Sequence, residues 1–134
     1  MIDSFLGKKY KLASSENFDE FMKALGVGFA IRKAGGLAHP VVELHKKDDK
    51  YVFTSNSTFK KIEFEFKDGV EFDQETPDGR NVKSVITIDG NVLNEVQKDS
   101  KGDTIIKRTF SDSELKMELQ FGEIKSVRTY KIHE

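Results

Sequence analysis

The sequence has 134 residues, 34% of them charged, and its acidic and basic residues nearly cancel to a formal net charge of −1. This length predicts one domain with an ordinary hydrophobic core, and the balanced charge gives no overall field that would favour a nucleic acid or an anionic membrane as a partner. The chain has no cysteine, which excludes disulfides, thiolate metal sites and thiol nucleophiles.

The N-terminal segment, MIDSFLGKKYKL, lacks the apolar run and the small-residue cleavage pattern of a signal peptide. No other stretch approaches the ~20 consecutive apolar residues of a membrane span. We therefore expect a cytoplasmic protein, with the nucleus left open as a further location. A first strand is predicted around Lys9 to Ala13, before any helix.

A helical segment follows, from Glu16 to about Leu37, where apolar side chains recur at helical spacing. The two glycines of LGVGF interrupt this spacing and predict two short helices joined by a tight turn. Ser15 or Asn17 is expected to cap the first helix. Gly35 and Gly36 are expected to end the second one.

The period of the apolar residues changes to two after Pro40 and stays so to the end of the chain. In KKIEFEFK and ELKMELQFG, apolar residues alternate with charged or polar ones, which is typical of antiparallel strands with one buried face. Turn signals separate about nine such strands and predict an up-and-down meander. The turn signals are KDDK, KDG, TPDG, IDG, SKGD, SDS and FGE.

About ten strands in a meander leave two exposed sheet edges unless the sheet closes into a barrel. Since about eight strands already enclose room for one small ligand, a wider barrel predicts an internal cavity. The expected fold is an all-β, ten-stranded, up-and-down antiparallel β-barrel, formed by residues 1–134 as a single domain. The two helices are expected to cover one open end of the barrel.

Two arginines share the apolar face of the last strands. Arg108 has the parity of Ile106 and Phe110 in TIIKRTF, and Arg128 has the parity of Tyr130 and the flanking isoleucines in SVRTYKIHE. A buried arginine cannot lose its proton and needs an anion or a set of acceptors. No acidic residue away from the loops shares this face on the last three strands, so no internal counterion is evident. A ligand carboxylate would satisfy both arginines and accept a hydrogen bond from Tyr130.

The rest of the predicted interior is apolar and suits a hydrocarbon tail. A long-chain fatty acid combines such a tail with a carboxylate. Burying the tail contributes ~0.8 kcal/mol per methylene, before the cost of ordering the chain is subtracted. The apolar interior residues are Phe18, Phe64, Phe66, Met117 and Leu119.

Over essentially its whole length, the chain resembles the intracellular fatty-acid-binding protein family of the calycin superfamily. The resemblance implies a ten-stranded β-barrel, a helix-turn-helix lid, a water-containing cavity and no enzymatic activity. We also expect a monomer without a metal or other cofactor, since the three histidines show no metal spacing. The stretches that carry the resemblance are FLGKKYKL, SENFDEFMKALGVGFAIRK, STFK, FDQETPDGRNVKS, ITIDGNVL, TIIKRTF and SVRTYK, in the family's order.

The family binds a carboxylate with two arginines and a tyrosine, the last two in an R-x-Y pattern, and by local match these are Arg108, Arg128 and Tyr130. Relatives that bind retinol tend to carry glutamine at both arginine positions. The arginines therefore favour an anionic ligand, and fatty acid and retinoic acid both remain open. The resemblance implies cavity, portal or lid positions at Phe18, Phe21, Met22, Val27, Ala30, Ala34, Pro40, Phe59 and Asp78, beside the interior Phe64, Met117 and Leu119.

Two features leave alternatives open. The family commonly has G-x-W-K-L near the start, whereas GKKYKL has Tyr10 in place of the tryptophan and one extra residue, so a shift or bulge is expected in the first strand. Lys23, Arg32 and Lys33 on the lid form either a solvated helix face or a basic patch. Such a patch would contact anionic membranes or a nuclear-import partner, as proposed for relatives, and would make the protein a lipid-sensing interaction protein.

Overall fold

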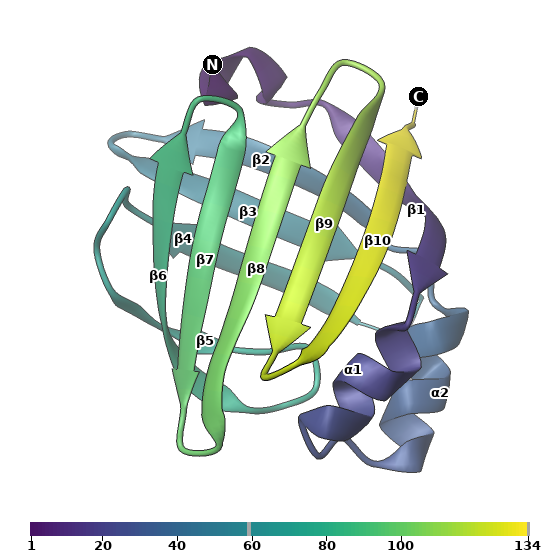
Figure 1. The fold of residues 1–134 in the computed structure, drawn as a ribbon. Coiled ribbons are helices and arrows are strands. Elements are labelled where there is room, and N and C mark those ends of the chain that lie inside the picture. Colours follow the sequence, from purple (N-terminus) through teal and green to yellow (C-terminus); the bar gives the residue numbers. More distant parts are fainter. Residues whose placement is uncertain (59, 134) are drawn as a thin grey trace.

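The computed structural model describes residues 1–58 and 60–133 and confirms the predicted fold, with ten antiparallel strands in a nearly closed barrel and two helices at one end (Figure 1). Each predicted turn signal falls at a junction between two strands. The elements are η1 (Ile2–Phe5, a 3-10 turn), β1 (Lys9–Glu16), α1 (Phe18–Ala24), α2 (Phe29–Leu37), β2 (Val41–Lys47), β3 (Lys50–Asn56), β4 (Lys61–Phe66), β5 (Phe72–Glu75), β6 (Asn81–Asp89), β7 (Val92–Asp99), β8 (Gly102–Phe110), β9 (Glu114–Phe121) and β10 (Ile124–Ile132).

The strands form a meander whose order in the sheet begins at β4, passes through β1 and β10, and ends at β5. Among the described residues, no ladder of hydrogen bonds joins β4 to β5. Aromatic rings pack across this junction instead, with the Phe72 centroid 5.7 Å from that of Phe64 and 6.5 Å from that of Phe66. Side-chain packing therefore closes the barrel where backbone pairing stops.

Strand β1 extends to Glu16, three residues beyond its predicted end at Ala13. Its pairing with β10 is interrupted by a β-bulge between Leu12 and Ser14 and then resumes. The expected irregularity of the first strand thus lies after Leu12, not beside the extra residue of GKKYKL. A bulge bends a strand without ending its pairing, which is why the strand outlasts the simple alternation.

Tyr10 takes the place expected for a large core aromatic. It is fully buried, packs edge-on against Phe110, and its hydroxyl donates a hydrogen bond to the Ser111 carbonyl at 2.9 Å. Burial, with a smaller effect of the negative charge of Asp112, raises the pKa of Tyr10 to about 12. The phenol therefore stays neutral inside the core.

The two predicted helices, α1 and α2, are confirmed. Gly26 lies in the turn between them with φ +86°, a conformation that a side chain would strain. The prediction that Gly35 and Gly36 end the second helix is wrong, because α2 continues to Leu37. At Gly35 the sulfur of Met22 on α1 lies 3.5 Å from the position a Cβ would take, which is an ordinary van der Waals distance, so the two helices pack against each other here.

Side-chain contacts hold the lid together and attach it to the barrel. Asn17 is the N-cap residue of α1, but its amide donates to the carbonyl of Lys125 on β10 at 2.8 Å and makes no capping bond. Arg32 donates to Asp19 Oδ1 at 3.1 Å and to the carbonyl of Val27 at 2.7 Å. The lid buries an apolar cluster against the barrel that consists of Phe21, Met22, Leu25, Val27, Ile106 and Leu119.

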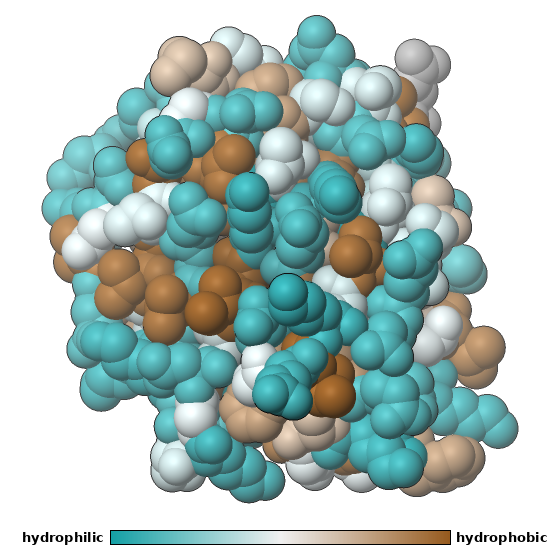
Figure 2. All heavy atoms as spheres, viewed as in Figure 1, coloured by the Kyte–Doolittle hydropathy of each residue, from teal (hydrophilic) through white to brown (hydrophobic). Residues whose placement is uncertain are grey.

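The main hydrophobic core includes Ile2 of η1. The element η1 lies at the end of the barrel opposite the helices (Figure 1). Hydrophilic side chains cover most of the face shown in Figure 2, with apolar side chains between them. Within the described residues, no helix is long and apolar enough to cross a membrane. The space between the main core and the lid contains the candidate site.

Candidate ligand-binding site

A cavity lies inside the barrel beneath the helices. Its volume, counted as space open to the centre of a water molecule, is about 180 Å³. Arg108, Arg128 and Tyr130 all line it. The other predicted residues in its walls are Phe18, Phe21, Met22, Pro40, Phe64, Asp78, Met117 and Leu119.

Four residues predicted for the interior or the lid do not line this cavity. Phe66, expected to contact the tail, is buried in the main hydrophobic core instead. Val27 is buried in the apolar cluster under α1, and on α2 Ala30 is exposed while Ala34 is half-buried. The lid contributes to the cavity mainly through α1, whose Phe18, Phe21 and Met22 are positions that the family resemblance implied. Phe59 lies outside the described residues, so its place at the cavity mouth stays a prediction.

The parity argument for the two arginines is confirmed. Arg108 is 6% exposed and Arg128 is 7% exposed, with Tyr130 buried on the same face of β10. Ile124 and Ile132, at the two ends of β10, are partly exposed because the strand extends beyond the interior there. Buried, inward-facing side chains therefore alternate with outward-facing ones only in the middle of β10.

The strand register places the two arginines in one row of the sheet. Arg108 on β8 is opposite Met117 on β9, which is opposite Arg128 on β10. Two strand spacings separate the arginine Cα atoms by about 10 Å. Long side chains on this row can therefore reach one ligand head group from two sides.

The guanidinium of Arg128 is held between polar and aromatic groups. Its Nε donates to Ser15 Oγ at 3.1 Å, and its carbon atom lies 3.8 Å from the ring centroid of Phe18 and 6.0 Å from that of Tyr130. Burial lowers the pKa of Arg128, because desolvation disfavours the charged form. In residues 1–58 and 60–133, no acidic side chain forms an ion pair with Arg128. Its positive charge is available to an anion in the cavity.

For Arg108, the expectation that no internal carboxylate is present is wrong. Glu95 on β7 is fully buried and accepts a hydrogen bond from Arg108 Nη1 at 2.6 Å. Its other carboxylate oxygen accepts from Gln97 Nε2 at 2.9 Å. The Arg108 guanidinium also lies over the ring of Phe53, 4.8 Å from its centroid. Arg108 is thus neutralised by the protein itself.

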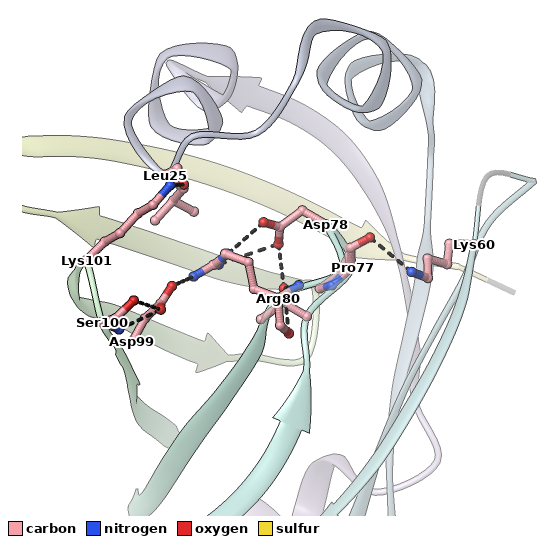
Figure 3. A network of polar contacts seen from close by, with 9 residues as sticks. Leu25, Lys60, Pro77, Asp78, Arg80, Asp99, Ser100 and Lys101 are labelled. Carbon is pink, nitrogen blue, oxygen red and sulfur yellow. Dashed lines mark hydrogen bonds and ion pairs between the residues drawn. The ribbon is translucent and has the colours of Figure 1, made fainter.

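A second ion-pair network surrounds Arg80 below the lid (Figure 3). Arg80 Nε donates to Asp78 Oδ2 at 2.6 Å, and Nη1 donates to Asp99 Oδ2 at 3.1 Å. Burial alone would lower the pKa of Arg80, but the bonds and charges of the two aspartates raise it. The hydrogen bond from Arg80 is the main reason that the pKa of Asp99 is lowered. The network joins the β5–β6 turn to the end of β7.

Two lysines extend these contacts toward the lid and toward β4. Lys101 Nζ donates to the carbonyl of Leu25 at 3.5 Å, and Lys60 Nζ donates to the carbonyl of Pro77 at 3.3 Å (Figure 3). Among the residues of the Arg80 network and these two lysines, only Asp78 was predicted from the sequence, as a residue near the cavity mouth. The sequence feature that could have drawn attention to the other residues is the concentration of charges in the turns DSKGD and TPDGR.

Comparisons with known proteins agree with this architecture. Residues 6–133 match the lipocalin / cytosolic fatty-acid binding protein family. The chain is 48% identical over 134 residues to the muscle fatty acid-binding protein of Schistocerca gregaria, with 98% of each chain covered. It is 45% identical over 130 residues to the adipocyte fatty acid-binding protein of Pygoscelis papua, covering 97% of this chain and 98% of the relative.

Solved structures match over nearly the full length. The Schistosoma mansoni fatty acid binding protein in complex with arachidonic acid has a TM-score of 0.95 and 40% identity, with 99% of this chain and 98% of that chain covered. The fatty acid-binding protein from brain tissue of Drosophila melanogaster has a TM-score of 0.90 and 55% identity, covering 95% of this chain and 98% of that one.

Proposed function

Because this chain belongs to the lipocalin / cytosolic fatty-acid binding protein family, we propose that it is a cytoplasmic carrier that reversibly binds a long-chain fatty acid inside the barrel and catalyses no reaction. The observation that carries the proposal is Arg128, a buried cation that lines the cavity and has no ion-pair partner among the described residues. A ligand carboxylate supplies that partner. Tyr130, on the same wall, donates a hydrogen bond from its hydroxyl to the carboxylate.

Arg108 contributes less to the head group than Arg128. One of its terminal nitrogens is already bonded to Glu95, so its net charge toward a ligand is small. Its place in the same row of the sheet lets it donate a further hydrogen bond to the carboxylate. The carboxylate site therefore consists of Arg128 and Tyr130, with Arg108 in support.

The apolar walls receive the tail and supply most of the affinity. Burial of about fifteen methylenes gives an upper limit of about 12 kcal/mol, which the loss of translational and chain freedom reduces to micromolar or nanomolar binding. Phe18 and Phe21 of α1 stack on each other with centroids 6.2 Å apart and face this space. The tail lies below them, between the lid and the strands.

The test is calorimetric titration of the delipidated protein with oleate and, in parallel, with oleyl alcohol, which keeps the tail and removes the charge. We expect tight binding of oleate and clearly weaker binding of the alcohol. Equal affinities would contradict the carboxylate mechanism. Arachidonate and retinoic acid extend the series, and preferential binding of retinoic acid would replace fatty acid by a retinoid as the ligand.

A second function, docking of the lid on anionic membranes, is favoured by one observation. Phe29 and Leu37 on α2 are 70% and 71% exposed, and Lys33 lies between them at i, i+4, i+8 spacing. Exposed apolar residues beside a cation suit an interfacial helix. Arg32 does not belong to this surface as a free cation, because its guanidinium bonds Asp19 and Val27.

We expect the Phe29→Ser/Leu37→Ser double variant to bind oleate like the wild type but to transfer it several-fold more slowly to vesicles containing phosphatidylserine. The reason is that apolar insertion adds to electrostatic attraction at the membrane surface. Ile105→Ser is the control, since Ile105 is an exposed apolar residue on the outer face of β8. Equal transfer rates in all three proteins would contradict membrane docking by α2.

A further inference from the structure

The interior of the barrel has two chemically different walls. The inward side chains of β2, β3 and β4 are mostly apolar or aromatic, and include Val42, Phe53 and Phe64, with Ser55 as a polar exception. The opposite wall, made by β5 to β8, buries an unusual number of polar groups for a protein interior. These buried polar residues are Gln74, Ser84, Glu95, Gln97, Thr104 and Arg108.

Most of these buried polar groups bond to one another. Ser84 donates to Gln74 Oε1 at 2.8 Å, and Glu95 accepts from both Arg108 and Gln97. Among the described residues, two buried side-chain atoms have no hydrogen-bond partner, namely Thr104 Oγ1 and Arg108 Nε. Both residues line the cavity. Since a buried polar atom without a partner is unfavourable, these two atoms indicate where a polar group of the cavity contents binds.

We propose that Thr104 and its cross-strand neighbour Gln97 form a second polar subsite, which binds a hydroxyl group on the acyl chain of a hydroxylated long-chain fatty acid. This inference rests on the proposed fatty-acid carrier function. Gln97 on β7 is directly opposite Thr104 on β8, and both are buried and line the cavity. A threonine hydroxyl both donates and accepts, and the Gln97 amide offers a carbonyl oxygen, so the pair matches a ligand hydroxyl.

The charge balance makes this subsite selective for an uncharged oxygen. Gln97 is bonded to the Glu95 carboxylate, so a second carboxylate on the ligand would be placed near a like charge. The Arg108 charge, which would otherwise attract an anion, is already paired with Glu95. A hydroxyl group is not repelled by Glu95 and does not need the charge of Arg108.

The register also sets the position of the hydroxyl along the chain. Thr104 lies four residues from Arg108 along β8, about 13 Å at the rise of a strand. The carboxylate is held at the row of Arg108 and Arg128, so the subsite receives an oxygen in the middle or distal part of the chain. A hydroxyl close to the carboxyl group does not reach it.

The test compares three ligands, octadecanoate, 12-hydroxyoctadecanoate and 3-hydroxyoctadecanoate, titrated into delipidated wild type, Thr104→Val, Thr104→Ser and Thr109→Val. Valine keeps the shape of threonine without the hydroxyl, and serine keeps the hydroxyl. Thr109 is on the same strand with its side chain on the other face, which makes Thr109→Val the matched control. Octadecanoate affinity reports whether each variant keeps a folded cavity.

In the wild type we expect 12-hydroxyoctadecanoate to bind within about threefold of octadecanoate and clearly more tightly than the 3-hydroxy isomer. Thr104→Val should weaken 12-hydroxyoctadecanoate by about five- to tenfold, the range of one hydrogen bond, with octadecanoate unchanged or tighter. Thr104→Ser and Thr109→Val should behave like the wild type. If Thr104→Val affects both acids equally, or the 3-hydroxy isomer binds best, the subsite is refuted while the carrier function stands. If octadecanoate does not bind the wild type, the carrier function is refuted as well.

Discussion

Arg128→Gln is expected to weaken oleate binding by about 1 to 3 kcal/mol, or roughly 5- to 150-fold in Kd, because it removes a charged hydrogen bond to the carboxylate. The affinity for oleyl alcohol should change little, since the alcohol carries no charge to pair with the guanidinium. Calorimetric titration of the delipidated variant with both ligands measures the difference.

The stability of the ligand-free protein should not fall in this variant. Arg128 is buried, and its guanidinium donates to Ser15 Oγ but forms no ion pair with the described residues. Glutamine in its place removes the cost of burying a charge. Lys131→Gln is the matched control, because it removes an exposed cation from the same strand. Unchanged oleate affinity in Arg128→Gln would show that another group holds the carboxylate.

Most of the barrel could be predicted from the sequence because its signals are local. The period of two, the turn residues between strands and the switch from helical spacing near Pro40 each depend on neighbouring residues only. The errors occur where distant contacts decide. The helix α2 continues through Gly35, where Met22 of α1 packs against it, and β1 passes Ala13 because β10 continues to pair beyond the bulge.

The site could be predicted only in part, for a related reason. Parity showed that Arg108 and Arg128 point inward, but the partner of a buried charge lies on another strand. In VLNEVQKD, Glu95 has the inward parity of Leu93, so an inspection of the strand preceding Arg108 would have found it. The pairing of Arg80 with Asp99 has no such signal, because the two residues meet only when two separate turns come together.

The pairing of Glu95 with Arg108 leads to the largest expected change in stability. Glu95→Gln should lower the free energy of unfolding of the delipidated protein by about 3 kcal/mol, because a buried arginine loses its counterion. Glu95 is fully buried and its bond to Arg108 Nη1 is 2.6 Å long, so water cannot replace the lost charge. Urea unfolding of the delipidated variant and the wild type measures the change.

The same variant should bind oleate more tightly, by about tenfold, since the freed charge of Arg108 becomes available to the ligand carboxylate. A bound ligand that supplies the missing counterion should also raise the melting temperature of Glu95→Gln more than that of the wild type.

In the Glu95→Gln/Arg108→Gln double variant, both charges are gone, so most of the lost stability should return and the gain in oleate affinity should disappear. If oleate affinity falls in the single variant and stability does not return in the double variant, Glu95 has a role other than balancing the charge of Arg108. A loss of stability together with a gain in affinity would show that the protein neutralises one of its two cavity arginines and leaves the other for the ligand.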